Sequence, residues 1–302
     1  MARRKSKKNT KKLISIIIAI ILAFFAYEAK DLVTENVDVS EFANGDAVYV
    51  HFIDVGQGSS TLIQQGTSGI LIDAGEKDYG QTVVDYLKDV GITSLEYVVA
   101  SHPHSDHIGG LDDVLYAFDV DTIIMPELEE LNTPSTRVYE DLLIAIEENH
   151  IKTVFQDGYL SGWYSLDDVE LMTIGASKQS DNLNNMSVIC RFRYLCDSDN
   201  GSDTEILILG DAEKEELKDI GVGKVDIISM PHHGSSTSIY KPFLDSADAD
   251  VAVISCGKDN SYGHPHKETL DYIEKNAMTC LRTDEMGDIV FKVTADGYSL
   301  VE

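Results

Sequence analysis

The segment His102-Pro103-His104-Ser105-Asp106-His107 most constrains what this chain can fold into. It places four candidate metal ligands within six positions, although the whole chain has only nine histidines. It directly follows the apolar run at 97–100, which is typical of a buried strand. A loop at a strand end can turn alternate side chains toward one point, and imidazole with carboxylate suits zinc, manganese or iron. The sequence therefore predicts a metal site rather than a solvated polar loop.

Further apolar runs lead into residues of the same kind. The runs at 206–209, 225–229 and 252–255 are followed by Asp211, by the pair His232 and His233, and by the pair His264 and His266. Seven of the nine histidines thus lie just after an apolar, strand-like run. This repeated placement strengthens the prediction of a metal site.

Strand-like and helix-like segments alternate along the rest of the chain. Strands are expected at 47–53, 61–64, 70–73, 97–100, 122–125, 170–174, 187–194, 204–209, 225–229, 251–255, 289–293 and 298–301, and helices at 82–89, 107–118, 135–148, 239–245 and 266–275. Strands dominate both halves, with helices between them. That pattern suits two facing sheets with helices outside.

The order of these motifs resembles the metallo-β-lactamase superfamily and, within it, the β-lactamase-like domain of the ComEC family of DNA-uptake proteins. The motifs are H-x-H-x-D-H at 102–107, G-D at 210–211, P-H-H-G-S at 231–235 and Y-G-H-P-H at 262–266, together with an opening strand and turn at 51–58. The resemblance covers about residues 47–301. It implies an α/β fold, the four-layer αββα sandwich, with the site at one edge between the sheets.

The resemblance also implies two divalent metal ions, with zinc expected and manganese as the alternative. His102 and His104 would belong to the first site, Asp106, His107 and His233 to the second, and Asp211 would bridge the two. Asp106 would count among the catalytic residues as well. A water between two cations would lose a proton near neutral pH, and this metal-bound hydroxide would be the nucleophile.

The chain departs from many members of the superfamily because no histidine follows at the usual place before Asp211. The only histidine in that interval is His150, which we interpret as a surface residue at the end of a helix. The corresponding stretch at 182–188 resembles the Asn-Asn-x-Ser segment of the ComEC-like group. An amide is a weaker ligand than imidazole, so the first metal would bind less tightly. This weaker ligand set makes zinc less certain and manganese more plausible. Asn185 could instead orient a substrate oxygen.

Other residues near the motifs are candidates for substrate contact or support. We expect His264 to act on the leaving group as a general acid or electrophile, with a structural turn residue as the alternative. Asp73 would support a ligand loop or fix a histidine tautomer. His266 is interpreted as the start of the following helix. The candidate substrate-binding residues are Asn185, His232, Ser235 and Tyr262, although Ser235 could merely cap the next helix.

The N-terminal region predicts attachment to a membrane. Residues 1–12 hold seven basic groups and no acid, and we interpret them as a cytoplasmic tail. Residues 13–27 are uncharged and apolar, and they are predicted to be a transmembrane signal-anchor followed by a stalk at 28–46 and the hydrolase domain at 47–302. Single-pass attachment would place that domain outside the cell. A cleaved signal peptide, giving a secreted protein, is the alternative, although 26–29 offers a poor cleavage site.

Charge limits the choice of partner. Of 24 basic residues, 17 remain after residue 12 against 52 acids, which gives a formal charge of −35. No basic nucleic-acid groove is evident, although a metal centre can supply positive charge locally. The four cysteines show no C-x-x-C spacing; most are expected to pack as small buried residues, and a disulfide cannot be assigned from the sequence.

These observations favour a metal-dependent phosphodiesterase or nuclease-type hydrolase at the outer cell surface. Its substrate would be DNA or an envelope phosphodiester, and the acidic domain favours a small or locally bound ester. A β-lactam, lactone or other ester hydrolase is the first alternative. The second is a non-enzymatic binding module whose fold is stabilised by metal, because one fold hosts many functions.

Overall fold

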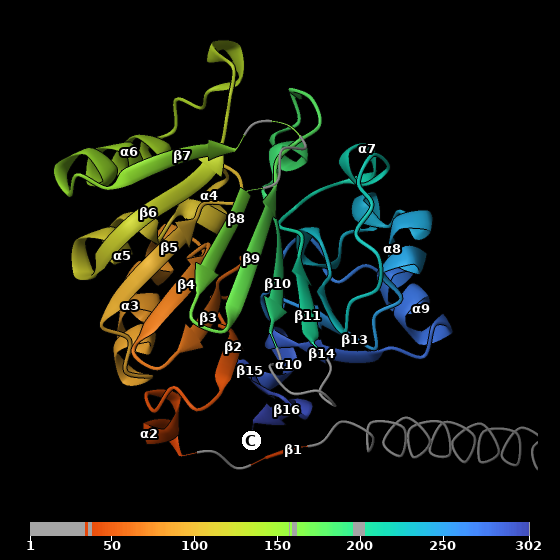
Figure 1. Ribbon diagram of the computed structural model, residues 1–302. Coiled ribbons are helices and arrows are strands. Elements are labelled where there is room, and N and C mark those ends of the chain that lie inside the picture. The colour runs from red at the N-terminus through yellow and green to blue at the C-terminus, as the bar shows by residue number, and fades with distance from the viewer. Residues whose placement is uncertain (1–33, 36–37, 157, 159–161, 196–202, 302) are drawn as a thin grey trace, which may run out of the picture. The chain divides into compact units, whose positions relative to one another are not determined.

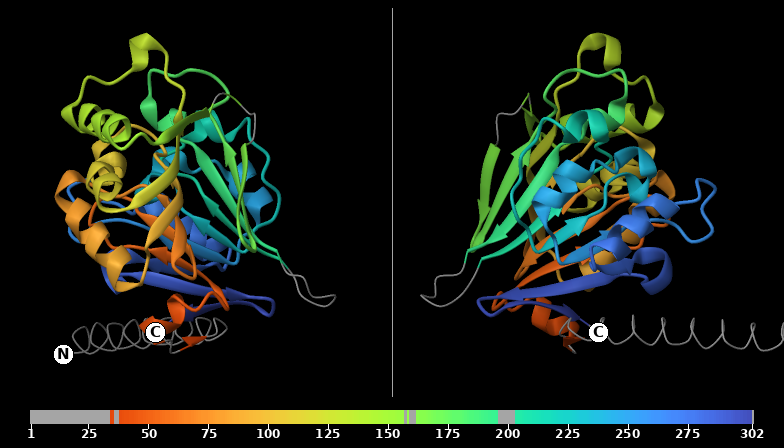
Figure 2. Two further views of the ribbon diagram at one scale, coloured as in Figure 1. Left: turned by 60° about the vertical axis from the view of Figure 1, so that its left-hand side comes forward. Right: turned by 90° about the vertical axis from the view of Figure 1, so that its right-hand side faces the viewer.

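The computed structural model describes residues 34–35, 38–156, 158, 162–195 and 203–301. Residues 35–302 form one compact unit, in which two mixed sheets pack against each other and helices cover their outer faces (Figures 1 and 2). This is the αββα arrangement expected from the sequence.

The larger sheet has nine strands in the order β1-β16-β15-β2-β3-β4-β5-β6-β7. Their bounds are Thr34–Glu35 (β1), Val48–Phe52 (β2), Thr61–Gln65 (β3), Ser68–Ile72 (β4), Ser94–Val99 (β5), Asp119–Pro126 (β6), Lys152–Gln156 (β7), Ile289–Thr294 (β15) and Gly297–Val301 (β16). Strands β2 to β4 form an antiparallel meander, and β4 to β7 run parallel to one another.

The smaller sheet has seven strands in the order β14-β13-β12-β11-β10-β9-β8. Their bounds are Gly162–Leu166 (β8), Val169–Ile174 (β9), Ile189–Tyr194 (β10), Thr204–Ile208 (β11), Ile227–Ser229 (β12), Val251–Ile254 (β13) and Thr279–Arg282 (β14). Strands β8 to β11 are antiparallel, whereas β11 to β14 are parallel. Strands β11 to β13 are short and mostly apolar because both of their faces are largely buried, whereas β14 at the edge has exposed positions.

Helices pack on both sheets. The larger sheet is covered by α3 (Gly80–Asp89), α5 (Leu111–Ala117) and α6 (Arg137–Glu148), and the smaller one by α7 (Lys214–Leu217), α8 (Lys241–Ala247) and α9 (Lys267–Lys275). Shorter elements are α2 (Val39–Phe42), α4 (Ser105–Ile108), α10 (Thr283–Met286) and the 3-10 turns η2 (Lys77–Tyr79), η3 (Glu130–Asn132), η4 (Leu183–Met186), η5 (His232–Gly234) and η6 (Ser236–Ser238).

The single helix expected at 107–118 is wrong, because two helices, α4 and α5, occupy this stretch. They are separated at Gly109 and Gly110, which pass very close to neighbouring backbone. A Cβ atom on Gly109 would lie 2.3 Å from the backbone nitrogen of Lys77, and one on Gly110 would lie 2.5 Å from the carbonyl oxygen of Ala74. Only glycine permits this approach, which fixes the short helix α4 and its ligands against the larger sheet.

Part of the predicted stalk belongs to the domain. Helix α2 lies within 28–46, and its Phe42 side chain is 6% exposed, with its ring centroid 4.6 Å from that of Tyr49. The predicted tail at 1–12 and anchor at 13–27 lie outside the described residues. Within the part of the chain that is described, no helix is long and apolar enough to cross a membrane. Of the cysteines described there, Cys190 and Cys256 are buried, Cys280 is exposed, and all three are free thiols.

Candidate metal centre

Strand ends from both sheets bring the predicted ligands together. Because β11, β12 and β13 are parallel, their carboxyl ends meet at one edge of the smaller sheet, and Asp211 and the pair His232 and His233 follow β11 and β12 there. His102 and His104 follow β5 of the other sheet, and α4 comes directly afterwards. Short apolar strands thus place polar side chains from distant parts of the sequence at one point.

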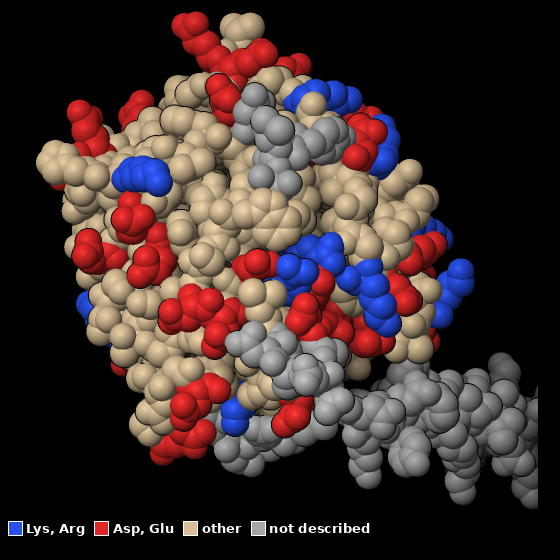
Figure 3. All heavy atoms as spheres, viewed as in Figure 1, with Lys and Arg blue, Asp and Glu red and all other residues tan. Residues whose placement is uncertain are grey.

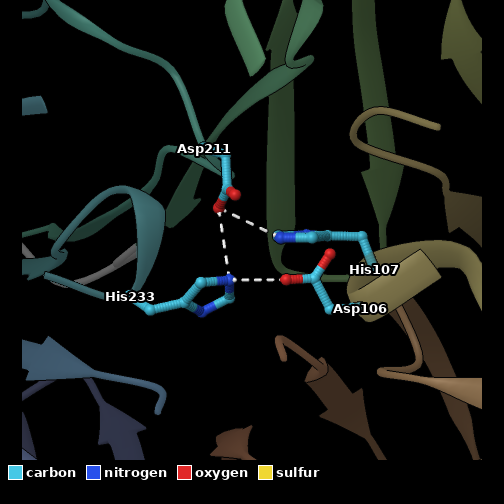
Figure 4. Close-up of side chains that lie close together, drawn as sticks. All are labelled: Asp106, His107, Asp211 and His233. Carbon is cyan, nitrogen blue, oxygen red and sulfur yellow. Dashed lines mark hydrogen bonds and ion pairs between the residues drawn. The ribbon is translucent and has the colours of Figure 1, made fainter. Parts of the chain in front are cut away.

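Four side chains form one potential metal-binding cluster (Figure 4). They are Asp106, His107, Asp211 and His233, and their potential ligand atoms all lie within 4.8 Å of one another. Nε2 of His107 lies 3.0 Å from Oδ1 of Asp211, and Nε2 of His233 lies 3.2 Å from Oδ2 of Asp106. All but Asp106 are buried.

A second cluster shares Asp211 with the first. It consists of His102, His104 and Asp211. Nε2 of His102 lies 3.8 Å from Oδ2 of Asp211 and 3.1 Å from Nδ1 of His104. The two groups match the two metal sites that the sequence predicted, with one carboxylate common to both.

Buried atoms without hydrogen bonds show that these residues fit a cation. Nε2 of His107 and Oδ1 of Asp211 are both buried and lie 3.0 Å apart as an ion pair, but neither atom forms a hydrogen bond of good geometry. Buried polar atoms nearly always form well-directed hydrogen bonds, so two facing ligand atoms without one are suited to share a cation. Imidazole nitrogen and carboxylate oxygen are donors for zinc and manganese. The clusters are therefore consistent with a metal site.

Hydrogen bonds behind the histidines fix their orientation. Nδ1 of His107 donates to Oδ2 of Asp73 at 2.7 Å, and Nδ1 of His233 donates to the carbonyl oxygen of Ser255 at 2.9 Å. A carboxylate and a carbonyl can only accept, so the proton lies on Nδ1 and leaves Nε2 free to bind a cation. Asp73 also accepts from the backbone nitrogen and the hydroxyl of Ser101. It thus lies where a supporting residue should.

Opposite charges face one another among the candidate ligands. Burial lowers the pKa of His107, but the negative charges of Asp211 and Asp73 outweigh it, and the pKa lies well above its usual value. Burial raises the pKa of Asp211, but His107 and His233 outweigh this effect and hold it well below its usual range. The centre therefore favours a positive charge beside Asp211, and binding of a cation would displace a proton.

A pocket of about 350 Å³ opens in front of the clusters. Its wall includes the ligand candidates His104, Asp106, Asp211 and His233. Also in the wall are Gln57, Glu76, Pro103, Ser105, Thr136, Asn184, His232, Tyr262 and His264. A ligand in this pocket would lie directly against the clusters, which is the arrangement that a hydrolase requires.

Two predicted substrate-binding residues do not line the pocket. Asn185 is buried, and its Oδ1 accepts from the backbone nitrogen of Glu213 at 3.1 Å. Its neighbour Asn184 takes the place at the wall. The Ser235 hydroxyl accepts from the backbone nitrogen of Thr237, so this serine caps the turn η6, the alternative that the sequence left open.

The loop before α9 brings His264 and Tyr262 to the pocket, as a role in substrate binding requires. Their rings stack with centroids 5.7 Å apart. Burial and the nearby charges of His233 and His232 lower the pKa of His264 to about 4. The ring is therefore neutral at pH 7, which favours the electrophile or hydrogen-bond donor over the general acid. His266 begins α9 and accepts from the backbone nitrogen of Ser236, consistent with a structural role.

Sequence reasoning missed Gln57 and Glu213. Oε1 of Gln57 accepts from the backbone nitrogen of Gly257 at 3.1 Å, and its Nε2 lies 3.4 Å from Nδ1 of His264. Glu213 receives a hydrogen bond from His232 at 3.2 Å, which lowers the pKa of Glu213 to about 2. The only available signals were the position of Gln57 between two glycines and that of Glu213 two residues beyond Asp211.

His150 belongs to neither cluster. It is exposed beyond the end of α6, and its φ is 54°. We expect His150→Asn to leave the bound metal unaltered, because asparagine tolerates a positive φ and no ligand is removed. Metal analysis of the purified variant by mass spectrometry checks this expectation. Loss of a metal ion from the folded variant would mean that His150 is the ligand histidine that many superfamily members carry before the residue corresponding to Asp211.

The fold is of the metallo-β-lactamase type, and the two clusters are consistent with a metal site of that fold. The sequence pattern of the Metallo-beta-lactamase superfamily matches residues 53–167, the stretch that contains the motif at 102–107. The chain is similar to this superfamily over that stretch.

The chain is also similar to longer proteins, among them a competence protein of Neisseria gonorrhoeae. It is 30% identical over 247 residues to Recombination protein 2 of Haemophilus influenzae, which covers 80% of this chain and 28% of that protein. It is 27% identical over 270 residues to ComE operon protein 3 of Bacillus subtilis, which covers 80% of this chain and 33% of that protein. The chain thus spans about a third of the length of these relatives.

Solved structures support the fold. The metallo-beta-lactamase fold protein YhfI from Bacillus subtilis superposes with a TM-score of 0.52 at 11% identity, covering 82% of this chain and 99% of that one. Igni18, a metallo hydrolase from Ignicoccus hospitalis, gives a TM-score of 0.50 at 14% identity, covering 81% of this chain and 98% of that one. These likenesses concern the fold alone.

Proposed function

We propose that this protein is a metal-dependent phosphodiesterase. The observation that carries the proposal is the Asp211 carboxylate, which is shared by two donor clusters at the base of an open pocket. Two cations about 3.5–4 Å apart, held by a shared ligand, are typical of enzymes that displace an oxygen at phosphorus. The similarity to Recombination protein 2 and to Competence protein ComA, together with motifs that resemble those of DNA-uptake proteins, supports a phosphodiester over a lactam.

The residues around the pocket would have different roles in ester hydrolysis. When bound, the cations would supply positive charge to the ester oxygens and make a nearby water acidic. Asp106 and Asp211 hold that charge in place, and Asp73 keeps His107 in the tautomer that binds it. His264, with a neutral ring, would donate a hydrogen bond to an ester oxygen, while Tyr262 borders the entrance of the pocket.

The surface charge favours a small or locally bound ester. On the face shown in Figure 3, acidic side chains are widely spread and basic side chains occur among them. Long duplex DNA is normally held by continuous basic surfaces, so it suits this protein less than a single ester or a strand end. We propose that the site meets its substrate outside the cell, on a domain anchored by residues 13–27.

Hydrolysis of bis(p-nitrophenyl) phosphate tests the proposal. The purified full chain is stripped of metal and reloaded separately with zinc and manganese, and the release of p-nitrophenol is measured for each form. We expect turnover that requires metal, with no comparable hydrolysis of the lactam nitrocefin. Absence of phosphodiester cleavage by both loaded forms, with nitrocefin cleaved, would assign the centre to lactams instead. Absence of both activities would favour a metal-stabilised binding module.

A further inference from the structure

The carboxylate of Asp211 lies among four imidazole rings, two on each oxygen. Nε2 atoms of His107 and His233 lie 3.0 Å and 3.6 Å from Oδ1. Nε2 atoms of His102 and His232 lie 3.8 Å and 3.7 Å from Oδ2. The fourth ring, His232, therefore faces the oxygen that belongs to the cluster of His102 and His104.

The two clusters are unequal without His232. The cluster of Asp106, His107 and His233 has three donors of its own besides the shared Asp211. The cluster of His102 and His104 has two. Zinc sites in proteins use three or four side-chain ligands, so a cluster that shares one of its three would hold its ion weakly. Nε2 of His232 lies 3.7 Å from the same Asp211 oxygen, but the ring is not within 4.8 Å of every donor of this cluster and must move closer to share an ion with them.

The orientation of His232 is that of a metal ligand. Its Nδ1 lies 3.2 Å from Oε1 of Glu213, so it carries the proton and leaves Nε2 free toward Asp211. Glu213 is itself held by the hydroxyl of Thr237, which donates at 2.7 Å. The pair of His107 with Asp73 and the pair of His233 with Ser255 follow the same plan. A carboxylate or carbonyl behind the ring is the usual support of a ligating histidine.

An unusual backbone conformation fixes the position of the His232 ring. His232 and His233 both have positive φ, at 52° and 54°, and Gly234 follows at 79°. Positive φ is uncommon for residues other than glycine and costs conformational energy, and such residues concentrate at functional sites. The consequence of this turn is that both neighbouring rings point their Nε2 atoms at the same carboxylate.

We propose that His232 is a metal ligand that completes the site of His102, His104 and Asp211, and that Glu213 positions it. The inference rests on the metal centre proposed above. It replaces the substrate-binding role that the sequence suggested for His232. Many superfamily members use a histidine located between the residues corresponding to His107 and Asp211 as a ligand of this site, and this chain has none at that place. His232 would provide the imidazole instead.

Manganese binding to the full chain tests the inference without relying on activity. Electron paramagnetic resonance distinguishes two neighbouring, magnetically coupled Mn²⁺ ions from an isolated ion, and titration gives the affinity for each. The variant His232→Asn removes the imidazole but suits a positive φ. Glu213→Gln keeps the shape and removes the charge, and His102→Ala removes a ligand from the same site. The variant His150→Asn is the matched control, and thermal unfolding of each metal-free variant confirms that it is folded.

We expect the unaltered chain with two equivalents of Mn²⁺ to give the coupled signal. His232→Asn should give an isolated-ion signal, with the second ion bound at least about 10-fold more weakly, as in His102→Ala. Glu213→Gln should lower the affinity for the second ion by about 10–100-fold without abolishing its binding. A coupled signal and unchanged affinities in His232→Asn would overturn the role of His232 alone. Failure of the unaltered chain to bind Mn²⁺ or Zn²⁺ would overturn the metal centre itself.

Discussion

Asp211→Ala should lose metal-dependent turnover by more than about 100-fold, since even the loss of a residue that only supports a ligand costs about 10–100-fold. The reason is that Asp211 is shared by both clusters, and each of its oxygens faces two imidazole nitrogens. Its removal leaves four rings without the negative charge that offsets two cations. Hydrolysis of bis(p-nitrophenyl) phosphate and metal content are measured on the same preparation.

Metal content separates a lost ligand from a lost fold. At the same free metal concentration, Asp211→Ala should bind less metal per protein molecule than the unaltered chain. Its metal-free form should still unfold in one cooperative transition. His150→Asn, which changes a histidine far from both clusters, should behave like the unaltered chain in each measurement. Equal turnover by Asp211→Ala and the unaltered chain at matched metal content would exclude the two-metal centre.

The sequence predicted the fold where elements are apolar and periodic. The strands that became β2 and β13 are short, largely apolar runs buried on both faces, and β5 and β11 are buried toward their carboxyl ends. The polar motifs follow the ends of these strands. It did not predict β7, β8 or β14, whose exposed positions interrupt the hydrophobic pattern. The break between α4 and α5 also escaped prediction, because it depends on how closely Gly109 and Gly110 approach segments distant in sequence.

The sequence predicted which residues gather at the site better than it predicted which of their side chains face the pocket. Histidines and acids that directly follow strands could be grouped, because strand ends converge at a sheet edge. Which of two adjacent side chains faces the pocket depends on the local turn. The 3-10 turn η4 buries Asn185 against the backbone of Glu213 and gives the pocket Asn184. Gln57 lies in the opening turn at 51–58 and Glu213 lies outside the motifs, and only the assembled structure shows what these two residues contact.

Asp73→Asn should weaken metal binding by about 10–100-fold while keeping the size of the side chain. Oδ1 of Asp73 accepts from the backbone nitrogen of Ser101 at 2.8 Å, and Oδ2 accepts from the Ser101 hydroxyl at 2.6 Å and from Nδ1 of His107 at 2.7 Å. An asparagine has one oxygen and one amide group, so an amide hydrogen must face one of these donors. The positive φ of Asp73, 61°, suits asparagine, and the backbone is expected to stay in place.

The main consequence concerns the tautomer of His107. If the amide faces Nδ1, the imidazole proton moves to Nε2 and blocks the nitrogen that faces Asp211 at 3.0 Å. If the amide faces the backbone of Ser101 instead, that buried nitrogen loses its acceptor, which costs about 1–3 kcal/mol of stability. Nitrogen NMR of the histidine rings distinguishes the two arrangements, and a metal titration gives the affinity.

Asp54→Asn is the matched control for this substitution. Asp54 lies three residues before Gln57 of the pocket wall, and its Oδ1 accepts from the backbone nitrogen of Gly56 at 3.0 Å. An amide oxygen can accept that bond equally well, so metal affinity should stay within about 3-fold of the unaltered chain. Unchanged metal affinity in Asp73→Asn, with the His107 proton still on Nδ1, would show that a carboxylate behind this ring is not needed. The four-imidazole arrangement around Asp211 would then have to hold its cations through the ligands alone.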